Sequence, residues 1–110
     1  MTEPSKALAL QELSQCRQEI ESIDNDLVEL LARRLRLGTR IAELKRIAEL
    51  PILDPTREAA VIRRVTTVAR EAGLPTEPIR EVFWQIVGMS RRAQEEAEVR
   101  ARGASRPEPT

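Results

Sequence analysis

The sequence contains no histidine and no tyrosine, and it has one cysteine, one tryptophan and one phenylalanine among its 110 residues. Without histidine the chain lacks the commonest general base of enzymes and the usual ligand sets of structural zinc. Cys16 alone cannot form an internal disulfide. So few aromatic rings leave no stacking platform for nucleic-acid bases. If this chain is an enzyme, its chemistry must do without histidine.

The chain also lacks an excess of charge of either sign, since eighteen Lys and Arg residues balance eighteen Asp and Glu residues. No overall electric field therefore favours a nucleic acid or an anionic membrane surface. No apolar run approaches the roughly 20 residues of a membrane span, and residues 1–10 lack the features of a signal peptide. These features predict a single cytoplasmic domain with neither a membrane nor a nucleic-acid partner.

Strong helix formers fill the chain from Ala7 to about Ile47, which predicts one long helix. Apolar side chains repeat along it at alternating spacings of three and four, as in a coiled coil. At about 1.5 Å per residue this helix spans roughly 60 Å, about twice the diameter of a small domain, so it cannot bury itself. We call its repeating positions the seam, and all except Arg34 are apolar: residues 13, 16, 20, 23, 27, 30, 34, 37, 41 and 44.

Two shorter helices are predicted in the second half of the chain. Asp54 followed by Pro55 is typical of a helix start, and Gly73 of a helix end. A further helix should begin at Thr76 and fade near Arg100. No segment alternates as a strand does, so the sequence predicts an all-α fold of three helices, about 40, 18 and 22 residues long.

This helix plan also predicts how the chain is organised and assembled. We expect residues 1–9 to form an N-terminal extension, residues 10–100 the domain and residues 101–110 a disordered tail. The two shorter helices can cover only part of the long one. The sequence therefore predicts a partner helix, most simply from a second copy in a two-fold homodimer.

Cationic residues occupy or border the apolar seam. Arg34 lies on it, where an unpaired buried guanidinium is unfavourable, and Arg17 and Lys45 flank it on one side. Arg34 and Lys45 lie about 16 Å apart along the axis, so their side chains can converge on a small anion. An antiparallel partner could bring its own arginine towards Arg34. This predicts a shared cationic pocket. The alternatives are a buried salt bridge or a register-setting polar residue at Arg34, and solvated charges at the other two positions.

Polar residues also interrupt the apolar pattern of the shorter helices. Ser90 and Gln94 fall on the inward line of the third helix, where a hydrogen-bonded polar pair in the core is the alternative to a binding role. Asp54 and Glu58 lie one turn apart at the start of the second helix, where free backbone amides gather. For Asp54, simple helix capping is the alternative.

Together these residues resemble the AroQ-type (all-helical, class II) chorismate mutases. The resemblance covers Leu10 to Ala97 and implies an interlaced homodimeric helical bundle of the chorismate mutase type II fold, with two active sites, each built from both chains. It implies the Claisen rearrangement of chorismate to prephenate in Phe and Tyr biosynthesis, which requires no nucleophile, metal or cofactor. The motifs that carry it are Arg17-x6-Asp24, Leu30-Leu-Ala-x-Arg34, Lys45, Pro51-Ile-Leu-Asp54-Pro-Thr-Arg57-Glu58 and Ser90-x3-Gln94.

The resemblance also implies how the substrate is bound. The partner's Arg17 and this chain's Arg34 would bind the two carboxylates of chorismate through charge-assisted hydrogen bonds. Ser90 would donate a further hydrogen bond to a carboxylate. Asp54 and Glu58 would hold the ring hydroxyl.

Catalysis, by the same resemblance, would depend on Lys45, Gln94 and Arg34. Lys45 and Gln94 would donate hydrogen bonds to the ether oxygen of chorismate as its bond to carbon lengthens. Some relatives carry glutamate at the position of Gln94 and need acid pH to keep that donor protonated. Gln94 therefore predicts activity that does not need acid pH.

Several alternatives remain open. Isochorismate-pyruvate lyases and 4-amino-4-deoxychorismate mutases share the scaffold and the cationic pocket, but the Asp-x-x-Arg-Glu loop at residues 54–58 favours a chorismate mutase. A non-catalytic coiled-coil dimerisation module, and a nucleic-acid binder using Arg33, Arg36 and Arg40, are different classes of alternative. The chain is too short to contain the second enzyme of bifunctional relatives. We expect a monofunctional protein, or one that docks with another shikimate-pathway enzyme.

Overall fold

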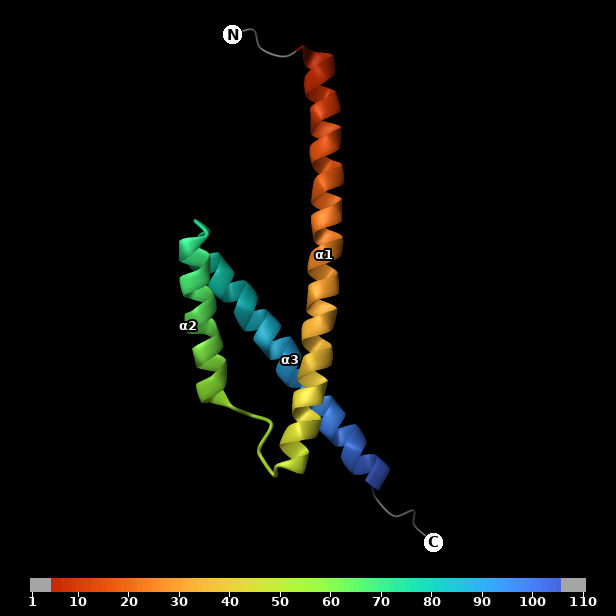
Figure 1. Ribbon diagram of the computed structural model, residues 1–110, viewed down its shortest axis with the longest axis vertical. Coiled ribbons are helices and arrows are strands. Elements are labelled where there is room, and N and C mark those ends of the chain that lie inside the picture. Colours follow the sequence, from red (N-terminus) through yellow and green to blue (C-terminus); the bar gives the residue numbers. More distant parts are fainter. Residues whose placement is uncertain (1–4, 106–110) are drawn as a thin grey trace. The chain divides into compact units, whose positions relative to one another are not determined.

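The computed structural model describes residues 5–105, which form three α-helices joined by short loops (Figure 1). The helices are α1 (Lys6–Ile47), α2 (Pro55–Glu71) and α3 (Thr76–Ser105). Residues 5–105 contain no strand, which confirms the predicted all-α class. No helix within residues 5–105 combines the length and the hydrophobicity of a membrane span.

The chain divides between Arg33 and Arg34 into two compact units. The described part of the first unit consists almost entirely of the N-terminal part of α1, and its seam is uncovered. Leu13, Ile20 and Ile23 are 43%, 56% and 56% exposed. Leu27 and Leu30, further along the seam, are each 53% exposed. Because burying a large aliphatic side chain contributes about 1.5–3 kcal/mol, this surface favours a partner that covers it.

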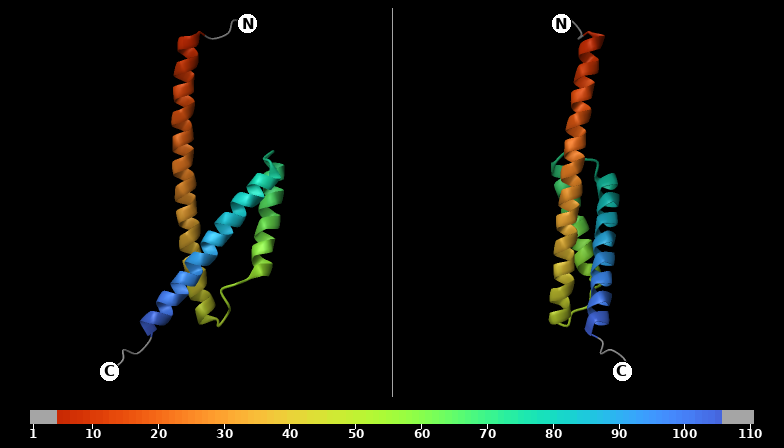
Figure 2. Two further views of the ribbon diagram at one scale, coloured as in Figure 1. Left: turned by 180° about the vertical axis from the view of Figure 1, so that it is seen from behind. Right: turned by 90° about the vertical axis from the view of Figure 1, so that its right-hand side faces the viewer.

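The second unit contains the end of α1 together with α2 and α3. Figures 1 and 2 show α2 and α3 side by side and antiparallel, with α3 also crossing the last turns of α1. Val61, Ile62 and Val65 of α2 form the core with Val87 of α3, and Phe83 packs against them. This apolar cluster holds α2 and α3 together and thereby fixes the polar side chains that share their inner faces.

The loop after α1 is set by two hydrogen-bonded helix ends. Helix α1 ends in a Schellman motif, in which the amides of Glu49 and Leu50 donate to the carbonyls of Arg46 (3.2 Å) and Lys45 (2.8 Å). Glu49 adopts a left-handed conformation there, with φ of 59°. At the start of α2, Asp54 Oδ1 accepts from the amide of Arg57 at 3.0 Å, which confirms the predicted helix cap.

Helix α2 ends as predicted at Gly73. Its φ is 74°, and the amides of Gly73 and Leu74 donate to the carbonyls of Arg70 (3.1 Å) and Ala69 (2.9 Å). This is a second Schellman motif, here with the residue type that adopts positive φ without strain. The short connection to Thr76 turns the chain back so that α3 can pack along α2.

Helix α3 is longer than the sequence indicated. It continues to Ser105, whereas we expected it to fade near Arg100, and residues 101–105 of the expected tail are helical. An ion pair between Arg102 and Glu98, one turn apart at 2.7 Å, supports the added turn, and Ala and Arg are strong helix formers. The rest of the expected tail, residues 106–110, lies outside the described residues.

Glu49 and Gly73 both have positive φ at the end of a helix, and together they give a matched pair of stability predictions. Glu49→Gly should raise the free energy of unfolding by about 0.5–1 kcal/mol, because glycine removes the steric cost of positive φ. Gly73→Ala should lower it by about 1 kcal/mol for the same reason, since no atom within 4 Å would contact the added methyl group. Urea denaturation of both variants measures these changes. Effects of the same sign at both positions would contradict the assignment.

Candidate active site

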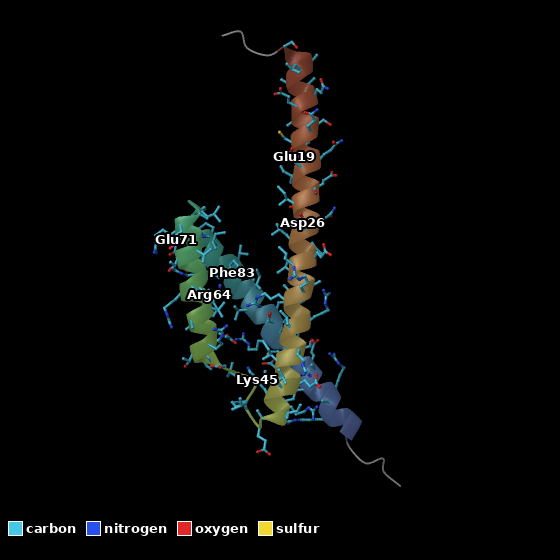
Figure 3. The ribbon with its side chains drawn as sticks, viewed as in Figure 1. Glu19, Asp26, Lys45, Arg64, Glu71 and Phe83 are labelled. Atoms are coloured by element: carbon cyan, nitrogen blue, oxygen red, sulfur yellow. The ribbon has the colours of Figure 1, made fainter. Side chains whose placement is uncertain are left out.

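One cavity of about 470 Å³ lies within the second unit, among the end of α1, the loop before α2, and the inner faces of α2 and α3. Its volume falls in the range of small-molecule sites. Figure 3 labels two of its cationic residues, Lys45 on α1 and Arg64 on α2. Of the seven predicted site residues, six line this cavity: Arg34, Lys45, Asp54, Glu58, Ser90 and Gln94. The structure therefore brings together residues that are up to 60 positions apart in the sequence (94 minus 34).

Arg34 reaches across the cavity from α1 to α3. Its Nη1 donates a hydrogen bond to Oγ of Ser90, which is only 7% exposed. Among residues 5–105 no carboxylate forms an ion pair with Arg34. The salt bridge that the sequence left open as an alternative is therefore absent from the described part of this chain, and the guanidinium keeps donors for another acceptor.

Lys45 is positioned by the loop that follows α1. Its Nζ donates to the carbonyl oxygen of Ile52 at 2.9 Å, and its own backbone carbonyl accepts from the amide of Leu50 at 2.8 Å. Since an ammonium group has three donors, one bond to Ile52 leaves the others available towards the cavity. The end of α1 and the following loop therefore position the Lys45 ammonium group. The sequence alone indicated only that Lys45 lies beside the seam.

Asp54 and Glu58 both lie at the start of α2. The Asp54 side chain caps the helix, so the capping role that the sequence offered as an alternative is present. Glu58 Oε1 accepts from Nη1 of Arg91 on α3 at 2.7 Å, with side-chain exposures of 16% for Glu58 and 35% for Arg91. This ion pair links α2 to α3 at the cavity wall.

Gln94 faces inward, as the pattern of α3 predicts. Its Oε1 is buried and accepts no hydrogen bond, while Nε2 lies 3.7 Å from where a Cβ on residue 38 would stand. Gly38, itself buried, thus leaves room for the Gln94 amide against α1. A buried acceptor without a donor is unfavourable, and nothing holds this amide in one rotational state.

The cavity carries an excess of positive charge. Five cationic and two acidic side chains line it, which leaves three positive charges uncompensated. Burial, and then the nearby charges of Arg64 and Arg57, lower the pKa of Arg34 below its ordinary value. A bound anion would relieve this repulsion, so the site favours a small ligand with more than one negative charge.

Two of these cations, Arg64 and Arg91, were not among the residues singled out from the sequence. Arg64 follows Arg57 by two helical turns on the same stripe of α2, a spacing that could have identified it. Arg91 pairs with a residue of another helix, and no local pattern shows that contact. Arg17 lies in the first unit with an exposed side chain, and it is not among the lining residues.

The fold and the cavity define a class of protein, a small all-helical domain with a cationic cavity whose lining contains no histidine. Comparison with known proteins identifies the family. A family model described as chorismate mutase type II matches residues 16–95, and the chain belongs to that family.

Individual relatives agree with this assignment. The chain is 36% identical over 76 residues to the T-protein of Enterobacter agglomerans, matching 69% of this chain and 20% of that protein. It is 34% identical over 62 residues to the chorismate mutase of Methanocaldococcus jannaschii, matching 56% of this chain and 63% of that protein. It therefore spans about a fifth of the first relative and just under two thirds of the second.

Two further similarities bear on the fold and on the range of substrates in the family. The chain is 35% identical over 63 residues to the 4-amino-4-deoxychorismate mutase of Streptomyces venezuelae, covering 57% of this chain and 61% of that protein. A solved structure of a conserved hypothetical protein from Pyrococcus furiosus matches with a TM-score of 0.58 and 35% identity, covering 83% of this chain and 99% of that one.

Arg34 has no carboxylate partner among residues 5–105, and this observation gives a stability prediction. Arg34→Leu should leave the free energy of unfolding unchanged within about 1 kcal/mol, because lost repulsion from two neighbouring arginines offsets the lost bond to Ser90. Urea denaturation of the wild type and the variant measures the difference. A loss of more than about 3 kcal/mol would instead indicate a structural ion pair.

Proposed function

We propose that this chain is a chorismate mutase, which rearranges chorismate to prephenate in aromatic amino-acid biosynthesis. The observation that carries the proposal is the uncompensated positive charge of a cavity whose lining also supplies neutral donors and acceptors. Chorismate has two carboxylates, an ether oxygen and a ring hydroxyl, and the cavity offers a group for each. The family assignment supports the same substrate.

The carboxylates of chorismate account for the cationic side chains. Arg34 binds one carboxylate with the donors that it does not use on Ser90, and Ser90 can turn its hydroxyl to donate as well. The second carboxylate is bound by the partner's Arg17. Fixing both groups holds the flexible side chain of the substrate over the ring, and this positioning is a large part of what an intramolecular rearrangement needs.

Lys45 and Gln94 interact with the ether oxygen of chorismate. In the Claisen step the bond from this oxygen to the ring breaks while a carbon–carbon bond forms, and negative charge builds on the oxygen. The Lys45 ammonium, held by Ile52, stabilises that charge. The Gln94 amide can rotate to donate from Nε2, because its Oε1 has no hydrogen-bond partner to break.

The ring hydroxyl accounts for the acidic residues. Glu58 keeps one carboxylate oxygen free of Arg91 and accepts a hydrogen bond from the hydroxyl there. Asp54 uses one oxygen for the helix cap, and its side chain or backbone supplies the second contact. No metal or cofactor enters this mechanism, because the bonding changes are all within one substrate molecule.

A homodimer with shared sites belongs to the same proposal. The exposed seam supports it, since Leu27, Leu30 and Leu37 are between 53% and 64% exposed and lie on one line of α1. A second copy of α1 carries a matching surface, and a two-fold arrangement buries both at once. Docking to another enzyme of the shikimate pathway and a cytoplasmic location stay predictions.

Lys45→Ala should lower kcat for chorismate by about 10²–10³-fold or more, because the developing charge on the ether oxygen loses its cation. The assay follows the loss of chorismate and identifies prephenate as the product. Lys6→Ala, which removes an exposed lysine at the start of α1, is the matched control and should leave the rate unchanged. Equal rates for Lys45→Ala and the wild type would refute the assigned role.

Gln94→Glu should make the reaction dependent on acid pH. A carboxyl at this position donates to the ether oxygen only when protonated, so kcat should fall as the pH rises through its pKa. The wild type, with a neutral amide, should show no such fall over the same range. Parallel pH profiles for the two proteins would show that residue 94 does not donate in the reaction.

A further inference from the structure

The ion pair between Arg91 and Glu58 differs from the other ion pairs found among residues 5–105. Those pairs join residues three or four apart on one helix, as in Arg40–Glu43, and at least one partner is well exposed. Arg91 and Glu58 come from α3 and α2, with a separation of 2.7 Å and side-chain exposures of 35% and 16%. Both residues line the cavity. The pair is therefore part of the site wall rather than a surface contact.

The pair determines what charge the cavity presents beside Glu58. A lone carboxylate at this point would attract any cationic group on a ligand, because partial burial strengthens the interaction. The guanidinium of Arg91 cancels that charge and occupies Oε1, which leaves Glu58 as a hydrogen-bond acceptor of little net charge. The other lining carboxylate, Asp54, already accepts from the backbone at the start of α2.

We propose that Arg91 is a specificity-determining residue, which makes the site select a neutral hydroxyl over a protonated amine on the ring of the substrate. This inference rests on the proposed function, in which Glu58 accepts from the ring hydroxyl. A hydroxyl needs only an acceptor, and the free oxygen of Glu58 supplies it. An aliphatic amine is protonated at neutral pH. It gains no net attraction from the Arg91–Glu58 pair, whose charges cancel, and the remaining excess of cations in the cavity lining repels it.

The amine-bearing counterpart of chorismate is 4-amino-4-deoxychorismate, the compound in the name of one relative of this chain. The experiment measures kcat/KM for both compounds with the wild type, Arg91→Met and Arg91→Lys. Arg92→Met is the matched control, because it removes an exposed arginine from the same helix, outside the cavity lining. Circular dichroism and thermal melting verify that each variant is folded.

The wild type should prefer chorismate by at least about tenfold in kcat/KM, a discrimination that repulsion between like charges can supply. Arg91→Met should shift the ratio towards the amine by about tenfold or more, since Glu58 then carries an unbalanced negative charge. Arg91→Lys keeps the charge and should keep the ratio within about threefold of the wild type. Arg92→Met should leave both rates unchanged.

A structural role for Arg91 alone would lower both rates by the same factor in Arg91→Met and leave the ratio unchanged, and that result would overturn the inference. If Arg91→Met does not fold, Arg91→Gln replaces it, because the glutamine amide can still donate to Glu58 but carries no charge. Arg91→Gln should shift the ratio of the two kcat/KM values in the same direction. An unshifted ratio overturns the inference. A wild type that prefers the amine also overturns it, although the site remains a mutase. Conversion of neither compound by the wild type would refute the proposed function and the inference with it.

Discussion

Repulsion among cations gathered in one cavity is the constraint on which the rest of this structure depends. Arg34, Lys45, Arg57 and Arg64 have only Asp54 and Glu58 to balance them, and Arg91 adds one more positive charge. Arg34 is the partly buried member of this group with a lowered pKa, and partly buried charge without a carboxylate partner lowers stability. A polyanionic ligand such as the proposed substrate would remove this repulsion. Substrate binding and stabilisation of the charged transition state would then both depend on the positive electrostatic potential of the cavity.

The end of α1 and the start of α2 position the charged side chains of the cavity. A Schellman motif closes α1 immediately after Lys45, and an aspartate cap opens α2 before Arg57 and Glu58. The loop between them is short enough that its Ile52 carbonyl reaches the Lys45 ammonium. Glu49 accepts a positive φ in this loop, a strain of the kind that concentrates near functional sites. Backbone hydrogen bonds at these helix ends thus help to position like-charged side chains around one cavity.

Much of this arrangement could be predicted from the sequence, because periodicity and capping are local. The seam made Arg34 stand out as an anomaly, and Asp54 with Pro55 marked the start of α2. The inward line of α3 placed Ser90, which is buried as expected. These predictions needed only the spacing of residues within one helix.

The remainder depended on contacts between helices, which spacing does not determine. Arg91 stands beside Ser90 in the sequence, yet its partner Glu58 is fixed only when α2 and α3 pack. The end of α3 was misplaced because a single ion pair of Glu98 with Arg102 and good helix formers outweighed the expected fraying. Local sequence signals thus identified residues that break the apolar pattern, whereas helix packing determines which of them come into contact.

We propose that each active site joins Lys45 of one chain to the partner's Arg17, and mixing two inactive variants tests this arrangement most directly. Arg17→Ala and Lys45→Ala should each be inactive as homodimers. After unfolding and refolding together, half of the dimers should be mixed, each with one intact site, so activity should return to about a quarter of the wild-type value. Refolded mixtures that contain mixed dimers but stay inactive would contradict the claim, as would full activity of Arg17→Ala alone.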